Sequence, residues 1–133
     1  MRSIKGKVAF ITGGTKGIGY GIAEILLQNG VNVAITGRSE ESVSKGVAHL
    51  KQTQGALGSI KGVIADVRDF ESQKKAVAET VASFGKIDFV IANAGVGHFA
   101  SLEDLTIEQW QETIDTNLSG PFYTFKATLE QLV

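Results

Sequence analysis

A glycine-rich segment near the start of the chain has the residue types and spacing of a phosphate-binding loop. Gly13, Gly17 and Gly19 follow a short apolar run that ends at Thr12, and helical spacing of apolar residues begins directly afterwards. Glycine lets the backbone approach a ligand closely, and the N–H groups and dipole of a helix start attract anions. The pattern therefore predicts a site for nucleotide phosphates. A plain tight turn between a strand and a helix is the alternative.

The motif is not a P-loop, which ends in Gly-Lys followed by Ser or Thr. Here Lys16 comes before Gly17 rather than after it. The remaining interpretation is a dinucleotide site at the end of a first strand.

Four short apolar runs, each followed by a helical pattern, define the elements that must position this loop. Near-continuous apolar strands joined by short connections are typical of a parallel sheet with helices on both faces. The chain is therefore predicted to be one α/β domain, residues 1–133, built on a doubly wound parallel sheet. The strands are expected at residues 8–12, 31–35, 63–65 and 87–92.

Capping residues mark the ends of the predicted helices. Ser39 and Asp69 precede two helical stretches, and Thr106 with Gln109 forms a capping-box pattern. Gly30 stands where a left-handed residue would end the first helix. The apolar stripes are Ile18, Ile22, Ile25 and Leu26 in the first helix and Val77, Val81 and Phe84 in a later one. Trp110 and the phenylalanines near the end are expected to pack rather than to contact a ligand, and Phe122, Phe125 and Leu129 are expected to lack covering partners within these 133 residues.

Composition and charge exclude several classes of protein. The chain has 133 residues, no cysteine and a formal net charge of −1. It therefore lacks the basic footprint of a nucleic-acid or membrane-surface protein, and it cannot form disulfides. No apolar stretch approaches the roughly 20 residues of a membrane span, and the charged residues 1–7 lead into a run too short for a signal peptide. A cytoplasmic protein is expected, without a metal site.

Four motifs resemble those of one family. The segment 12–19, Thr-Gly-Gly-Thr-Lys-Gly-Ile-Gly, is similar to the T-G-x-x-x-G-I-G signature of the short-chain dehydrogenase/reductase family. Asp66-Val67, the turn Asn93–Gly95 and Asn117 resemble three further motifs of that family, in the same order. Two positions depart from the family pattern, namely Ala92, where many members have asparagine, and Gly14.

The resemblance implies a Rossmann fold and hydride transfer between NADP(H) and a small carbonyl or alcohol substrate. It also implies a homo-oligomer, a dimer or tetramer. A non-catalytic NADP(H)-binding or interaction module is the alternative function. The residues implied to contact the cofactor are Gly13, Thr15, Lys16, Gly17, Ile18, Gly19, Arg38, Asp66, Val67, Asn93, Ala94 and Gly95.

Only one member of the family's catalytic tetrad maps onto this sequence, namely Asn117. The tetrad's tyrosine and lysine are separated by three residues, but Tyr20 is followed at that spacing by Glu24 and Tyr123 by Ala127. The serine, tyrosine and lysine are therefore expected beyond Val133, and the 133 residues alone should be inactive. The final helix has no stop signal, which favours an N-terminal portion of a longer chain over a natural small domain.

Cofactor choice is predicted from the end of the second strand. NAD-binding sheets place an acid there, about 20 residues past the glycines, to bind the ribose hydroxyls. Arg38 occupies that place, and a guanidinium fork suits a 2′-phosphate. Lys16 would add a second cation on the same side, although a solvated surface lysine is equally compatible with its position. The sequence thus favours NADP(H).

Asn117 has a second interpretation that comes from its neighbours. In a regular helix its carbonyl would accept a hydrogen bond from residue 121, which is proline and has no N–H. The freed carbonyl matches the water-holding role that the family resemblance implies, and a simple proline kink is the alternative. His98 could line the mouth of a substrate site or lie on the surface, whereas His49 is expected to be solvated.

Overall fold

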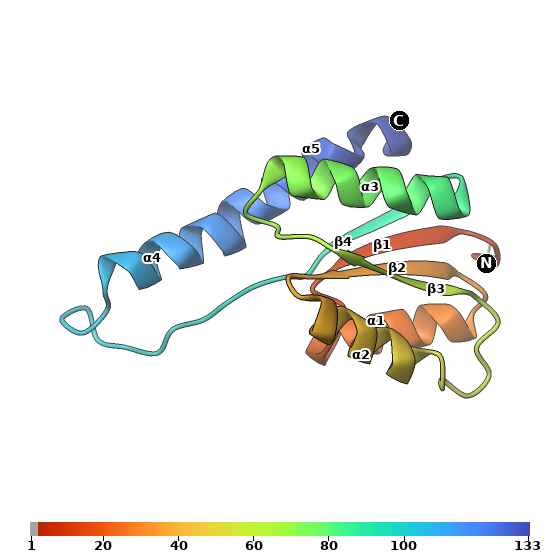
Figure 1. Cartoon of the computed structure of the whole chain (residues 1–133), viewed down its shortest axis with the longest axis horizontal. Coiled ribbons are helices and arrows are strands. Elements are labelled where there is room, and N and C mark those ends of the chain that lie inside the picture. Colours follow the sequence, from red (N-terminus) through yellow and green to blue (C-terminus); the bar gives the residue numbers. More distant parts are fainter. Residues whose placement is uncertain (1–2) are drawn as a thin grey trace.

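The computed structural model describes residues 3–133, and helices follow strands along the chain as predicted (Figure 1). Met1 and Arg2, which open the predicted domain, lie outside the described residues. A π-helical segment, η1, links the last two helices into one continuous rod. The elements are β1 (Val8–Thr12), α1 (Gly17–Gln28), β2 (Asn32–Gly37), α2 (Glu40–Leu50), β3 (Ile60–Ile64), α3 (Phe70–Phe84), β4 (Phe89–Ala92), α4 (Ile107–Ile114), η1 (Asp115–Ser119) and α5 (Gly120–Leu132).

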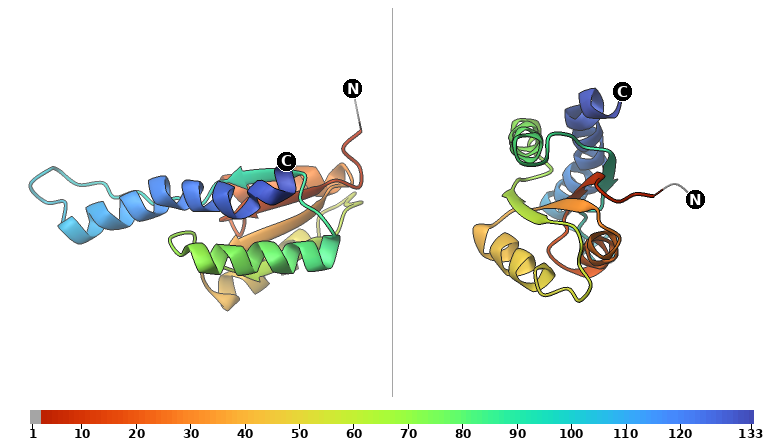
Figure 2. Two further views of the ribbon diagram at one scale, coloured as in Figure 1. Left: turned by 90° about the horizontal axis from the view of Figure 1, so that it is seen from above. Right: turned by 90° about the vertical axis from the view of Figure 1, so that its right-hand side faces the viewer.

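The sheet is parallel, with the strand order β3-β2-β1-β4. Strand β1 lies between β2 and β4, so the chain winds outward in one direction through β2 and β3 and then crosses over to β4. Helices α1 and α2 cover one face, and α3 and α5 cover the other (Figure 2). The predicted doubly wound α/β sheet, the Rossmann fold, is confirmed.

Side chains that alternate along the central strands build one core on each face of the sheet. Val8 and Phe10 of β1 pack toward α3 with Ala76 and Val77. Ala9 and Ile11 face the opposite way, in a core completed by α1 and α2. Strands buried on both faces explain why the runs are almost continuously apolar.

The predicted helix boundaries are confirmed where a cap was identified. Ser39 accepts a hydrogen bond from the Ser42 N–H, Asp69 caps α3, and Thr106 forms the full capping box with Gln109. Gly30 follows α1 with φ of +80°, the left-handed geometry expected there.

The apolar face predicted for α1 is confirmed for Ile22 and Leu26, which pack against the core, and wrong for Ile18 and Ile25. The buried residues of α1 are Gly19, Ala23 and Leu27, whereas Ile18 is 78% exposed and Ile25 is 58% exposed. The small residues Gly19 and Ala23 share this contact with the large residues Leu27, Ile22 and Leu26. Hydrophobicity patterns favour large side chains, so they included the exposed Ile18 and Ile25 and passed over the buried Gly19 and Ala23.

Three strands differ from their predicted bounds, and β2 spans Asn32–Gly37 rather than 31–35. Strand β3 spans Ile60–Ile64 rather than 63–65, because Val33 to Gly37 of β2 pair with residues 60–64. Strand β4 begins at Phe89, although Ile87 just before it is fully buried beneath α3. Lys61 and Gly62 interrupt the apolar run at β3, so the sequence predicted too short a strand. Backbone pairing with β2 extends the strand over these two residues despite their low β propensity.

The segment after β4 extends away from the sheet and returns as α4, which projects from the body of the molecule (Figures 1 and 2). Large apolar side chains of α4 and α5 are about half exposed, which differs from the packing expected for Trp110 and agrees with the missing covering partners expected for Phe122 and Phe125. Trp110, Phe122 and Phe125 are 56%, 59% and 49% exposed. No helix in residues 3–133 has the length and apolar character needed to cross a membrane.

Candidate functional site

A cavity of about 730 Å³ opens at the carboxyl ends of the strands. The loop after β1 forms one wall, the ends of β2 and β3 form a second, and the loop after β4 with η1 forms a third. From β1 the chain continues to β2 and β3 on one side and later to β4 on the other, so the order of the strands reverses at β1. Ligands of open α/β sheets bind at such switch points. The lining residues are Gly13, Thr15, Lys16, Thr36, Gly37, Arg38, Ser39, Ser42, Ala65, Asp66, Val67, Arg68, Ala94, Gly95, Val96 and Thr116.

Glycine is required at three positions of the first loop, for different physical reasons. Gly13 and Gly17 adopt φ of +66° and +63°, a conformation that other residues rarely take. Gly13 also lies against Ala94, since a Cβ there would come within 2.7 Å of the Ala94 Cα. Gly19 is buried, and a Cβ on it would collide with the Asn93 side-chain amide. Two of these glycines therefore let the first and fourth strand loops touch.

Thr12 joins the same two loops through a single buried oxygen. Its Oγ1 accepts hydrogen bonds from the Asn93 N–H at 3.1 Å and from the Ala94 N–H at 3.2 Å. The Asn93 amide in turn donates to the Gly13 carbonyl at 3.1 Å. The predicted phosphate loop and the predicted Asn93–Gly95 turn thus form one hydrogen-bonded unit. Sequence reasoning used Thr12 as part of a motif and missed this bridging role.

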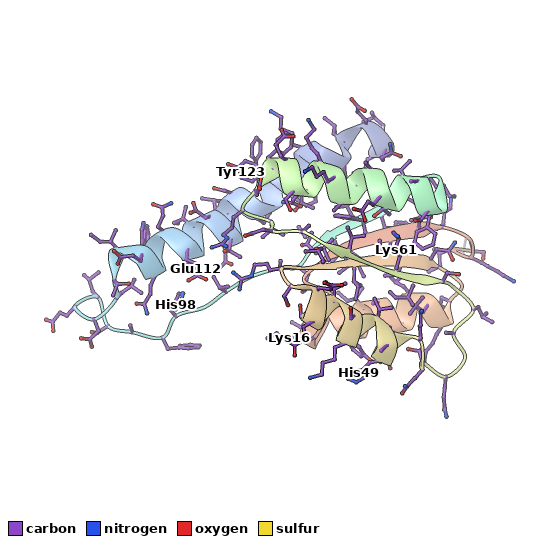
Figure 3. The ribbon with its side chains drawn as sticks, viewed as in Figure 1. Lys16, His49, Lys61, His98, Glu112 and Tyr123 are labelled. Atoms are coloured by element: carbon purple, nitrogen blue, oxygen red, sulfur yellow. The ribbon has the colours of Figure 1, made fainter. Side chains whose placement is uncertain are left out.

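Two cationic side chains line the cavity on the loops after β1 and β2. Arg38 follows β2 and Lys16 precedes the first turn of α1, and both line the cavity. Lys16 is exposed beside the start of α1 (Figure 3). The unpaired N–H groups of that helix start add to the favourable field for an anion. This arrangement can hold a phosphate group.

Arg68 is a further cation of the cavity that sequence reasoning missed. Its guanidinium binds the Asp66 carboxylate through Nε and Nη2, with an Nη2–Oδ2 distance of 2.7 Å. This hydrogen-bonded pairing lowers the pKa of Asp66 despite partial burial, and the charge of Arg38 acts in the same direction. The reciprocal bond raises the pKa of Arg68. The signal that could have identified Arg68 is its position two residues after Asp66, just beyond the end of β3.

Gln73, also not predicted, connects the loop after β3 to the last helix. It is buried, and its amide donates to the carbonyls of Val67 at 2.8 Å and Gly120 at 3.2 Å. Its Oε1 accepts from the Thr124 hydroxyl at 2.8 Å. This buried bridge fixes the cavity wall at Val67 relative to the start of α5.

Asn117 lies in η1 and does not line the cavity. Its side chain donates to the Val96 carbonyl at 2.7 Å and accepts from the Val96 N–H at 2.8 Å. The distortion expected around Pro121 takes the form of the π-helix, in which the Gly120 N–H bonds to the Asp115 carbonyl. Such segments are frequent at functional sites. Asn117 thus holds the backbone just after the Asn93–Gly95 turn.

The structure gathers most of the predicted contact residues but not all of them. Gly17, Ile18, Gly19 and Asn93 stand outside the lining, and Asn93 and Gly19 support it from behind. The predicted residues in the lining are Gly13, Thr15, Lys16, Arg38, Asp66, Val67, Ala94 and Gly95.

The two histidines lie outside this cavity. His98 contacts Glu112 of α4 at 3.3 Å and so ties the extended segment to that helix (Figure 3). His49 is exposed on α2, as predicted.

A Gly-rich loop, a switch-point cavity and gathered cations define a nucleotide-binding α/β protein. Comparison with known proteins identifies the family within this class. The family model described as short chain dehydrogenase matches residues 7–133. The chain belongs to the short-chain dehydrogenase family, which consists of nicotinamide-dependent oxidoreductases.

Individual relatives agree with this membership. A peroxisomal 2,4-dienoyl-CoA reductase of Saccharomyces cerevisiae is 40% identical over 131 residues, covering 96% of this chain and 44% of the reductase. An NADP-dependent (R)-specific alcohol dehydrogenase of Lentilactobacillus kefiri is 34% identical, covering 97% and 50%. The crystal structure of an alcohol dehydrogenase from Thermococcus sibiricus, complexed with 5-hydroxy-NADP, superposes with a TM-score of 0.84 at 38% identity, covering 94% and 52%. The chain spans about half the length of the relatives it matches.

Proposed function

We propose that this protein is an NADP(H)-dependent oxidoreductase and that residues 1–133 form its NADP(H)-binding domain. The observation that supports this best is the convergence of Lys16, Arg38 and Arg68 on one cavity that also meets Gly13 and the start of α1. One carboxylate, Asp66, balances only part of this charge. A site with surplus positive charge suits a dinucleotide that has an additional phosphate.

Each predicted contact residue has a proposed role in that site. The loop residues Gly13, Thr15, Gly17, Ile18 and Gly19 receive the bridging phosphates at the helix start. Arg38 and Lys16 bind the 2′-phosphate. The adenosine part lies against Asp66 and Val67, and the turn formed by Asn93, Ala94 and Gly95 supports the sugar.

The proposed reaction is hydride transfer between NADP(H) and a small carbonyl or alcohol. Bound NADPH would supply the hydride, and Asn117 would act in the family's tetrad through its backbone carbonyl. Neither Tyr20 nor Tyr123 has a lysine at the required spacing, so the proton-transferring tyrosine is not among these 133 residues. The yeast relative is peroxisomal by name, and a cytoplasmic location for this protein stays a prediction.

Nucleotide titration tests the proposal directly. The chain is expected to bind NADPH at least tenfold more tightly than NADH, because a phosphate–arginine bond is charge-assisted. Both dissociation constants are measured by fluorescence at one fixed ionic strength, since salt screens an exposed pair. Equal affinities would contradict the choice of NADP(H). Absence of binding to either nucleotide would overturn the function itself.

Self-association is expected from the surface of α5 and the edge of the sheet. Phe122, Phe125 and Leu129 leave a row of exposed apolar side chains, and β4 is an edge strand. Exposed edges and apolar patches attract other chains. Sedimentation of the 14.1 kDa chain at tens of micromolar should therefore show a dimer or larger species. Replacing Phe125 and Leu129 with glutamate should give a monomer, whereas a monomeric wild type would contradict the prediction.

A further inference from the structure

Gln73 of α3 is a buried amide that none of the proposed nucleotide contacts uses. The residue is 1% exposed and lies outside the cavity lining. Its amide nitrogen donates to the carbonyls of Val67 and Gly120, and its Oε1 accepts from the Thr124 hydroxyl. Burying an amide is unfavourable unless its groups are paired, and here the partners belong to two separate segments of the chain. One side chain therefore ties these two segments together.

The helices that Gln73 joins, α3 and α5, lie side by side, and the buried residues at their contact are mostly small (Figures 1 and 2). Small side chains form shallow ridges, so their packing resists sliding of one helix along the other only weakly. Within residues 3–133, both side-chain hydrogen bonds that run from α3 to α5 involve Gln73. These bonds therefore fix how far along α3 the helix α5 lies. The small buried residues are Ala76 and Thr80 on α3 and Gly120, Thr124 and Thr128 on α5.

The register of α5 on α3 in turn sets the separation of two cavity walls. Val67 belongs to the wall after β3, and its carbonyl accepts the 2.8 Å bond from Gln73. Gly120, which accepts the 3.2 Å bond, directly follows η1. Asn117 of η1 holds Val96, which lines the wall after β4, through two hydrogen bonds. A displacement of α5 would therefore move the wall at Val96 relative to the wall at Val67.

We propose that Gln73 is a positioning residue for nucleotide binding, because its amide holds these two walls of the cavity at a fixed separation. The inference rests on the proposed NADP(H) binding, and it assigns Gln73 no contact with the nucleotide itself. A ligand binds more tightly between walls that are already held in place, since binding then orders less of the protein. Without the amide, the Val67 carbonyl is left unpaired and the loop after β3 is free to shift.

Removal of the amide tests the proposal. Gln73→Met keeps the length of the side chain and should weaken NADPH binding about three- to tenfold, the range for one neutral hydrogen bond. Thr124→Val removes only the bond to Oε1 and should cause a smaller loss. In the Gln73→Met background Thr124→Val should add no further loss, because the two side chains act through one contact. Thr128→Val is the matched control: its hydroxyl bonds only within α5, so NADPH affinity should stay unchanged.

A pH profile of Gln73→Glu separates positioning from packing. The neutral carboxyl group can donate to the Val67 carbonyl and accept from Thr124, whereas the ionised group can only accept. Burial raises the pKa of such a carboxyl group, so both forms are reached between about pH 5.5 and pH 8. The ratio of the NADPH dissociation constants of Gln73→Glu and the wild type should therefore rise about tenfold over this range. The ratio cancels the titration of the nucleotide's own phosphate.

Wild-type NADPH affinity in Gln73→Met, with a lowered midpoint of urea unfolding, would overturn the inference, because Gln73 would then only stabilise the fold. A ratio independent of pH in Gln73→Glu would overturn it as well. Hydrogen exchange of the free chain gives a readout without nucleotide: the Gly120 N–H, bonded to the Asp115 carbonyl, should exchange faster in Gln73→Met. If the wild type does not bind NADPH, the proposed function is wrong. Faster exchange at Gly120 would then still support the positioning of α5, and unchanged exchange would overturn it.

Discussion

Arg38→Asp is expected to weaken NADPH binding at least tenfold and to leave NADH binding unchanged or improved. A hydrogen bond to a charged group contributes about 1.5–3 kcal/mol, which corresponds to about 10- to 150-fold in affinity. Arg38 is exposed at the cavity rim, and water weakens an exposed charged pair. Loss of the arginine alone should therefore cost about tenfold in NADPH affinity, and repulsion by the new aspartate adds to that loss. The new carboxylate repels a 2′-phosphate, but it can accept hydrogen bonds from the ribose hydroxyls of NADH.

The experiment measures both dissociation constants at one ionic strength. Lys75→Asp makes the same change in charge on the exposed surface of α3, away from the cavity lining, and should alter neither constant appreciably. Equal losses for NADPH and NADH in Arg38→Asp would mean that Arg38 has a structural role. Unchanged NADPH affinity would assign the phosphate to Lys16 or Arg68 instead.

Gly13→Ala should lower the free energy of unfolding by about 3 kcal/mol, because two separate costs add. A non-glycine residue at positive φ costs roughly 1–2 kcal/mol. The new methyl group would also lie 2.7 Å from the Ala94 Cα, which is backbone and cannot simply rotate away. Overpacking of this kind typically costs about 1–3 kcal/mol. NADPH binding should weaken as well, because the loops after β1 and β4 are pushed apart.

Gly17→Ala is the matched control, measured by the same urea unfolding. Gly17 has nearly the same φ, +63°, but a Cβ there meets open space. It should therefore cost only the conformational part, about 1–2 kcal/mol. Equal losses in the two variants would show that contact with Ala94 contributes nothing. No loss in either would contradict the positive φ values.

The local elements of this fold could be predicted because their signals lie within a few residues of one another. Ser39, Asp69 and Thr106 cap helices through bonds to N–H groups two or three positions away. The apolar runs of β1 and β2 follow from burial on both faces of the sheet. Arg38 could be assigned to the cavity because a strand end in a parallel sheet always lies at the same edge as the glycine loop.

The contacts that complete the candidate site join residues far apart in the sequence. Thr12 reaches Asn93 and Asn117 reaches Val96, and no short pattern encodes either pairing. The sequence determined by itself the doubly wound sheet, the position of the glycine-rich loop after β1 and the family. Only the tertiary structure decided which residues of α1 pack and which polar groups find partners, including the buried amide of Gln73. The physical reason is that close approach of helix, sheet and loop depends on the shape of all three at once, whereas hydrophobic period and capping depend on one segment alone.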